Sequence, residues 1–332
     1  MGEPLPQSIR AQAHDLGPQL EPALLDACGG RLRDVRWFRT DWQRGGAATA
    51  FAEVLLGEGG SEETREAVVK LPLGPREYRA MTMLQGEGNP APRVAFHGTE
   101  LGGWDLGWVV MERLPGNPLA AHLHKGVFEE LAHAAARFYK CAGEAWKPIA
   151  PHNEWDWAGL LEKARESAKI NPIPQGQSWA NHIHHVQRSL PALLEIWLNR
   201  DMTTWCHGDL HPGNLMQRPE GSAWGEPGAV LLDFAEVHCG HWVEDGVYLE
   251  RQYWAKPEAL EEVKPVSLIA RARRKLGLAT DDDYATLATI RRVLMASVAP
   301  AFLERDGHPK YLEAALGILD RFYPPLVKSL NT

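Results

Sequence analysis

The sequence predicts an α+β protein in which a strand-rich front part precedes a larger, mostly helical rear part. Short apolar runs bounded by turn residues fill the first 114 residues, whereas from about residue 127 apolar residues recur at helical spacing. A Pro- and Gly-containing link near residues 115–118 separates the two patterns. A chain of 332 residues is long enough for two lobes with separate cores. We expect a helical lead-in over 1–30, a small strand-rich lobe over 31–114 and a helical lobe over 115–332.

In the front part, the pattern predicts helices and short strands that form an antiparallel meander. A helix is expected over residues 7–27, and residues 61–64 form a polar loop. A second helix is expected over 75–85, with Pro75 in its first turn. The strands are expected at 31–40, 48–56, 66–72 and 107–112, with a further strand in the second part of 88–100, after its Pro-rich turn.

In the rear part, four segments have helical period and length, and one segment interrupts them. Thr280 and Asp281 are suited to cap the third helix. The interruption at about 203–240 contains two short apolar runs and two polar clusters. The helical segments are 127–146, 178–200, 280–304 and 311–326.

Composition excludes several classes of protein. The formal charge of −8 argues against general nucleic-acid binding, which requires a basic surface. Four cysteines without CxxC spacing indicate reduced thiols in a cytosolic protein. The start of the chain has no signal-peptide pattern, and no run of apolar residues approaches the length of a membrane span.

The first polar cluster is "HGDLHPGN", residues 207–214. Pro212 and Gly213 exclude a helix, so a loop can direct Asp209 and Asn214 toward one place. Asp209 could accept a proton from a hydroxyl group, and the Asn214 carbonyl oxygen could bind Mg²⁺. A structural turn in which Asp209 acts as a cap explains this segment equally well.

The second cluster is "LLDFAEV", residues 231–237, in which Asp233 ends an apolar strand. The carboxylate suits Mg²⁺, although a turn-forming aspartate is common at a strand end. The pairing is more specific than either part. An Asp-x4-Asn loop followed about twenty residues later by an apolar-Asp-Phe segment is the arrangement of the protein-kinase phosphoryl-transfer site.

Together these motifs resemble the aminoglycoside phosphotransferase and choline kinase family, the small-molecule branch of the protein-kinase-like fold. The resemblance extends over roughly residues 30–325. It implies a two-lobe fold with a nucleotide-binding antiparallel-sheet lobe and a helical lobe that holds the catalytic loop and the acceptor. It also implies that Asp209 is the catalytic base and that Asn214 and Asp233 are the Mg²⁺ ligands.

The resemblance assigns supporting roles to three further residues. His207 corresponds to the histidine that braces the catalytic loop. His211 lies where protein kinases often carry a lysine near the transferred phosphate, which implies a phosphate contact. Asp245, in "WVEDGVY", corresponds to the helix aspartate that hydrogen-bonds the loop from behind.

In the front lobe, Lys70 of "AVVKLP" resembles the strand lysine that neutralises nucleotide phosphates. Its implied ion-pair partner is Glu77 on the following helix. Two other interpretations stay open. Lys70 could be a solvated strand-end lysine, and Glu77 could be without this partner because Arg76 and Arg79 share its helix.

The remaining nucleotide contacts are implied less specifically. "VVMERLPG" resembles the hinge, where backbone groups near Glu112 and Leu114 would hold adenine. No GxGxxG loop is present, and only Gly45 and Gly46 are offered for the phosphates. Ala235 replaces the glycine of the protein-kinase Asp-Phe-Gly motif, which removes backbone freedom there.

The sequence therefore predicts a cytoplasmic small-molecule kinase that binds Mg²⁺. It would move the γ-phosphate of ATP, with GTP not excluded, to a hydroxyl of an aminoglycoside, amino alcohol or sugar-like acceptor. No nucleic-acid or membrane partner is expected. The acceptor and the oligomeric state are left open.

Two other hypotheses compete with this one. The missing glycine-rich loop favours a nucleotide-binding pseudokinase without transfer activity. A zinc site would need ligands that lack CxxC or HExxH spacing: Cys206, His207, His211, His238, Cys239 and His241.

Overall fold

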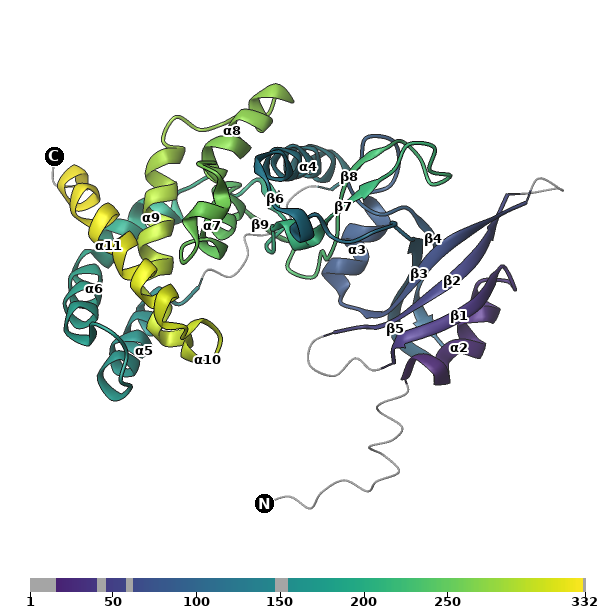
Figure 1. Ribbon diagram of the computed structural model, residues 1–332, viewed down its shortest axis with the longest axis horizontal. Coiled ribbons are helices and arrows are strands. Elements are labelled where there is room, and N and C mark those ends of the chain that lie inside the picture. The colour runs from purple at the N-terminus through teal and green to yellow at the C-terminus, as the bar shows by residue number, and fades with distance from the viewer. Residues whose placement is uncertain (1–15, 41–45, 58–61, 147–154, 331–332) are drawn as a thin grey trace, which may run out of the picture. The chain divides into compact units, whose positions relative to one another are not determined.

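The computed structural model (Figure 1) describes residues 16–40, 46–57, 62–146 and 155–330. Within it the chain divides into two compact units. A sheet-rich unit contains Met1–Leu119 and Gly213–Val237, and a helical unit contains Ala120–Pro212 and His238–Thr332. A small antiparallel-sheet unit and a larger helical unit confirm the predicted fold class.

The sheet-rich unit is built on one five-stranded sheet with the order β1-β2-β3-β5-β4. Every neighbouring pair is antiparallel, as predicted. Glu63 and Thr64, which were expected in a loop, instead extend the third strand because they pair with Leu56 and Leu55. The strands are β1 (Leu32–Arg39), β2 (Ala48–Leu56), β3 (Glu63–Leu73), β4 (Val94–Leu101) and β5 (Trp104–Glu112).

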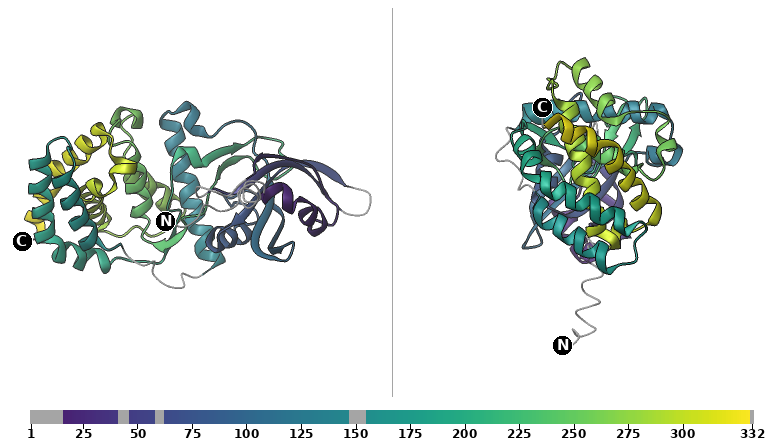
Figure 2. Two further views of the ribbon diagram at one scale, coloured as in Figure 1. Left: turned by 90° about the horizontal axis from the view of Figure 1, so that it is seen from below. Right: turned by 90° about the vertical axis from the view of Figure 1, so that its left-hand side faces the viewer.

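One face of this sheet packs against helix α2 (Leu16–Ala27) (Figure 1 and Figure 2). Successive side chains of a strand point to opposite faces, so Thr49 and Lys70 point away from this core. The C-terminal end of β3 leads into helix α3 (Pro75–Met83), which has Pro75 in its first turn as predicted. The buried core includes alternate residues of β2 and β3: Ala48, Ala50, Ala52, Val54, Ala67, Val69 and Leu71.

A hairpin far along the chain completes the sheet-rich unit. It consists of β7 (Leu215–Arg218) and β8 (Gly228–Leu231), which pair antiparallel. Arg218 Nε donates to Glu112 Oε2 over 2.8 Å, and Arg218 Nη2 donates to Glu112 Oε1. The Leu231 backbone N–H also donates to the Pro90 carbonyl over 2.6 Å. These contacts attach the segment between the two polar clusters to the sheet.

The helical unit contains the predicted helices and others that the sequence analysis missed. The four predicted segments correspond to α4, α6, α9 and α11, whereas α5 and α8 were not expected. A short antiparallel pair, β6 (Thr204–Cys206) and β9 (His238–Gly240), flanks the sheet-rich insertion. The helices are α4 (Lys125–Ala145), α5 (Trp157–Ile170), α6 (Gly176–Leu198), α7 (Val243–Gln252), α8 (Pro265–Lys275), α9 (Tyr284–Ser297), α10 (Leu303–Asp306) and α11 (Pro309–Leu330). The 3-10 turns are Leu119–His122, Pro212–Asn214, Pro257–Leu260 and Ala299–Phe302.

The predicted cap of the third helix is wrong. Helix α9 begins at Tyr284 with Asp283 at the N-cap position, so Thr280 and Asp281 precede it. The Asp281 carboxylate instead lies 2.7 Å from His241 Nε2. No helix in the described part of the chain is long and apolar enough to cross a membrane.

Candidate active site

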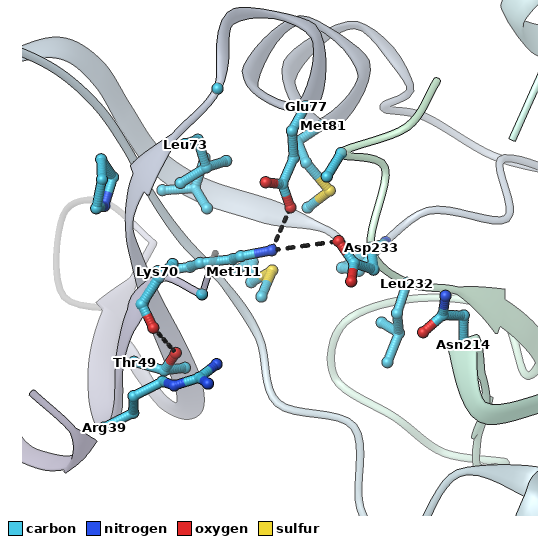
Figure 3. A pocket seen from close by; sticks show the side chains of 17 residues that line it. Arg39, Thr49, Lys70, Leu73, Glu77, Met81, Met111, Asn214, Leu232 and Asp233 are labelled. Atoms are coloured by element: carbon cyan, nitrogen blue, oxygen red, sulfur yellow. Dashed lines mark hydrogen bonds and ion pairs between the residues drawn. The ribbon is translucent and has the colours of Figure 1, made fainter. Parts of the chain in front are cut away.

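The sheet-rich unit contains a cavity of about 570 Å³ that is lined by residues from both of its chain segments (Figure 3). Lys70, Glu77, Asn214 and Asp233 all line it. With Gly46, five of the predicted site residues therefore share one cavity, although up to 187 positions separate them in the sequence. Apolar side chains that include Leu73, Met81, Val109, Met111 and Leu232 form much of its remaining wall.

Lys70 lies at the centre of the charged groups in this cavity. Its Nζ donates a hydrogen bond to Glu77 Oε1, and the same nitrogen lies 3.7 Å from Asp233 Oδ1. Glu77 is buried in the first turn of α3, and this burial raises its carboxyl pKa while the charge of Lys70 opposes the rise. The ion pair expected between Lys70 and Glu77 is thus formed, even though Arg76 and Arg79 share the helix.

Asn214 and Asp233 are held together by the β7–β8 hairpin. Asn214 immediately precedes β7, and Asp233 follows β8 by two residues. The Leu232 backbone N–H donates to the Asn214 carbonyl over 2.8 Å, which ties the two ends. Asp233 has a φ of 60°, a left-handed conformation that is uncommon outside glycine and is often found at functional sites. The hairpin therefore directs an amide and a carboxylate to the same cavity.

The predicted hinge residues lie beside the cavity wall. Met111 lines the cavity, whereas the side chain of the next residue, Glu112, is buried and pairs with Arg218. The Glu112 backbone N–H donates to the Arg93 carbonyl over 2.8 Å. Leu114 is buried just beyond the end of β5.

Of the two glycines assigned to the phosphates, Gly46 lines the cavity. Gly45 lies outside the described residues. Arg39 and Thr49 also line the cavity, although the sequence analysis did not name them. The cavity-facing position of Arg39 could have been recognised only from its pairing with Thr49 across β1 and β2.

The loop that carries Asp209 belongs to the helical unit, where helix α7 holds it by its backbone. Asp245 Oδ2 accepts the His207 N–H and Asp245 Oδ1 accepts the Gly208 N–H, each over 2.8 Å. Tyr139 also donates its hydroxyl to Asp245 over 3.0 Å. His207 is fully buried, and its Nδ1 accepts the Asp209 backbone N–H over 3.3 Å. The backbone that precedes Asp209 is therefore fixed on two sides.

The side chain of Asp209 is held by Tyr248, a residue that the sequence analysis missed. The Tyr248 hydroxyl donates to Asp209 Oδ1 over 2.5 Å. His211 Nε2 lies 3.5 Å from the other oxygen, Oδ2. Tyr248 follows Asp245 by three residues, so both lie on one face of α7. This i, i+3 spacing was visible in "EDGVY", but its meaning depends on the loop that α7 contacts.

The cysteines and histidines of the zinc hypothesis make other contacts. His238 Nε2 lies 3.7 Å from Glu244 Oε2, and His241 pairs with Asp281. Burial lowers the pKa of His241, and the hydrogen bond with Asp281 opposes that shift. Burial raises the pKa of the Cys206 thiol well above its ordinary value. Among the residues that the structure describes, no group of three or more His, Cys, Asp and Glu side chains could hold a metal ion.

The family model for the phosphotransferase enzyme family matches residues 16–279, which is most of the chain. The chain belongs to this family. The assignment confirms the predicted family and the prediction of a small-molecule kinase. The matched range includes all of the site residues predicted from the sequence, in both units of the chain.

Solved structures with the same fold act on several kinds of small molecule. A microcompartment-associated aminopropanol kinase is 15% identical, with a TM-score of 0.55 over 89% of this chain and 93% of the other. A spectinomycin phosphotransferase in complex with ADP and spectinomycin is 13% identical, with a TM-score of 0.52 over 95% and 97%. A choline/ethanolamine kinase family protein from Mesorhizobium loti is 11% identical, with a TM-score of 0.51 over 98% and 97%. No curated protein matches the sequence.

At these identities the structural matches establish the protein-kinase-like fold. They do not select one acceptor, because the matched proteins are named for an amino alcohol, an antibiotic and choline or ethanolamine.

Proposed function

We propose that this phosphotransferase transfers the γ-phosphate of ATP, as its Mg²⁺ complex, to a hydroxyl group of a small molecule. The observation that carries the proposal is the cavity of the sheet-rich unit, where Lys70, Glu77, Asn214 and Asp233 meet. An ammonium group held between two carboxylates, in a cavity that an asparagine also lines, is suited to a phosphate chain and a hard cation.

The donor set of the cavity fits Mg²⁺. Magnesium prefers oxygen ligands and is usually bound through one or two protein groups together with substrate phosphates and water. The Asp233 carboxylate and the Asn214 amide oxygen supply two such groups, and the hairpin contact between Leu232 and Asn214 keeps them together. When bound, the ion neutralises charge on the phosphate oxygens. Lys70, steadied by Glu77, would bind the same phosphate chain.

In this proposal Asp209 is the base. Its carboxylate would orient the acceptor hydroxyl and take its proton, while His207 and Asp245 hold the loop and His211 contacts the phosphate. The hydrogen bonds from His207 and Gly208 to Asp245 support this assignment, because positioning supplies much of the acceleration in phosphoryl transfer. Adenine would be held by backbone groups of Glu112 and Leu114, next to Met111 in the cavity wall.

The acceptor class proposed is a hydroxylated amine or sugar-like molecule. Matched structures support this range, since one contains ADP with spectinomycin and another contains AMP-PNP with hygromycin B. ATP is proposed as the donor, and use of ATP would place the reaction in the cytoplasm.

The second candidate is a pseudokinase, which the absence of a GxGxxG loop favours. Such a protein would bind nucleotide in the same cavity without transferring phosphate. The simultaneous presence of Lys70, Asp209, Asn214 and Asp233 supports the enzyme instead, because a binding module has no need of a base.

The deciding experiment measures ADP formation from ATP and Mg²⁺ against a panel of amino alcohols, sugars and aminoglycosides. Asp209→Asn is run beside the wild type and is expected to lower acceptor-dependent turnover by a factor of about 10²–10⁴, the usual contribution of a general base. Its affinity for ATP should stay unchanged. A wild type that binds ATP but consumes none with any acceptor class would favour the pseudokinase.

A further inference from the structure

We propose that Arg39 binds the phosphate chain of the nucleotide, in the part of the site where a glycine-rich loop would otherwise supply backbone N–H groups. This inference rests on the proposed function, since it requires a nucleoside triphosphate in the cavity. Arg39 is the last residue of β1, and it lines the cavity together with Lys70.

The strand register places Arg39 in the same row as the lysine. Arg39 pairs with Thr49, Thr49 pairs with Lys70, and Lys70 pairs with Val109. Residues that are directly opposite on neighbouring strands project to the same face of a sheet. All four line the cavity, so the row crosses four strands and faces it throughout. In Figure 3 the side chains of Arg39 and Lys70 extend toward the side where Asn214 and Asp233 lie.

Gly46 gives the Arg39 guanidinium its position. A Cβ atom at Gly46 would overlap Nη1 and Cζ of Arg39, so the guanidinium lies directly on the glycine backbone. Gly46 does not have a positive φ, and the need for glycine here comes from space rather than from backbone conformation. The clash involves the end of a flexible side chain. Alanine would therefore displace the guanidinium without disturbing the sheet.

The charge balance of the cavity also points to Arg39 as a phosphate ligand. Among the described residues that line the cavity, the charged ones are two cations, Arg39 and Lys70, and two carboxylates, Glu77 and Asp233. Both carboxylates already lie beside the Lys70 ammonium. Without Arg39, the described part of the lining would have one more negative than positive charge, which opposes binding of a polyanion.

The chemistry of a guanidinium suits this task. Its planar fork forms two parallel hydrogen bonds to phosphate oxygens, and it keeps its charge at any physiological pH. Arg39 is exposed at the strand end, so its exchange leaves the buried core of the unit intact.

The test measures the affinity of the full-length protein for ATP with Mg²⁺ and for adenosine by calorimetry. Arg39→Gln is expected to weaken ATP binding about tenfold to a hundredfold, the effect of losing a charge-assisted contact. Adenosine binding should be unchanged, since adenosine has no phosphate. Arg39→Lys keeps the charge but loses the planar fork, so its affinity for ATP should lie between those of the wild type and Arg39→Gln. Arg36→Gln changes an exposed arginine of the same strand that does not line the cavity, and it should match the wild type.

Gly46→Ala provides an independent arm. It should reproduce most of the defect of Arg39→Gln. The double variant should bind ATP no more weakly than Arg39→Gln, because both changes remove the same contact.

If Arg39→Gln binds ATP like the wild type, the proposal is overturned while the kinase assignment stands. If Gly46→Ala is defective and Arg39→Gln is not, the glycine acts through its own backbone and the proposal also fails. A wild type that binds neither ATP nor adenosine would overturn the proposed function along with it.

Discussion

At the scale of single residues, the hydrogen bond from Tyr248 to Asp209 makes a specific prediction. A hydroxyl that donates to one carboxylate oxygen leaves the other oxygen to receive the acceptor proton. Tyr248→Phe removes this donor, and a hydrogen bond to a charged group contributes about 1.5–3 kcal/mol. We expect kcat to fall at least about tenfold, with the KM for ATP unchanged, in steady-state assays with the acceptor identified from the panel.

The matched control is Tyr253→Phe. It deletes a tyrosine hydroxyl at the C-cap of α7, away from the loop that carries Asp209. Tyr253 packs edge-on against Phe128. Its variant should keep the wild-type kcat. If kcat falls equally in both variants, or if KM for ATP rises while kcat is unchanged, Tyr248 acts only through folding or nucleotide binding.

What the sequence could predict at this scale depends on where each residue's partner lies. Lys70 and Glu77 are seven positions apart, and a known motif relates them. Tyr248 and Asp209 are 39 positions apart, and Arg39 reaches the cavity only through the pairing of strands β1 and β2. Sequence reasoning finds a residue whose partner belongs to the same motif. It misses one whose partner is brought near by the fold.

At the scale of elements, Glu244 in the first turn of α7 joins several parts of the helical unit. Its carboxylate lies 3.1 Å from Arg200 Nη2, which follows α6, and 3.8 Å from Arg291 Nη2 of α9. Burial acts to raise its pKa, but the nearby His238 imidazole and the charges of both arginines outweigh it and hold the pKa well below the ordinary value. The buried carboxylate is therefore ionised and links β9, α6, α7 and α9.

The ionised Glu244 carboxylate predicts that the stability of the protein depends on pH. A carboxyl group with a lowered pKa in the folded state stabilises the fold above its unfolded pKa of about 4.3, and the contribution is lost as the pH falls below that value. Glu244→Gln should cost about 3 kcal/mol at pH 7, because it removes a buried negative charge from beside Arg200 and Arg291. In urea unfolding, the difference in the free energy of unfolding between variant and wild type should be smaller at pH 3.5 than at pH 7.

An exposed ion pair provides the comparison for that experiment. Glu162 pairs with Arg165 one turn along the surface of α5. Glu162→Gln should leave the unfolding midpoint unchanged at every pH, since exposed pairs contribute little. A gap for Glu244→Gln that stays constant with pH would mean that the loss comes from packing rather than from the ionised carboxylate.

The elements themselves were predictable to the extent that their pattern is local. The long amphipathic helices α4, α6, α9 and α11 follow from periodicity alone. Helix α5 had a readable start, since Asp156 accepts the Gly159 N–H over 2.9 Å, but it is preceded by a Trp-rich segment without clear period. The misplaced cap of α9 has a tertiary cause, because Asp281 is bound to His241, a residue 40 positions away.

At the scale of the whole molecule, the chain returns to the sheet-rich unit over residues 213–237 after almost a hundred residues in the helical unit. No local pattern predicts this return. It depends on contacts such as that of Arg218 with Glu112, 106 positions apart. The return is what delivers Asn214 and Asp233 to the cavity of Lys70, so the metal site we propose exists only in the folded chain.

This dependence predicts that nucleotide and Mg²⁺ stabilise the protein together. A ligand that binds only the folded state adds about 2.7 kcal/mol at a hundred times its Kd. We expect ATP with Mg²⁺ to raise the melting temperature more than ATP with EDTA. In Asp233→Asn the melting temperatures with Mg²⁺ and with EDTA should be equal, because the carboxylate that joins the ion to the hairpin is lost. Asp105→Asn alters an exposed carboxylate on β5 outside the cavity and should keep the full difference. If Asp233→Asn retains that difference, Mg²⁺ is bound by the phosphates and other groups, and the return of the chain serves folding rather than the metal.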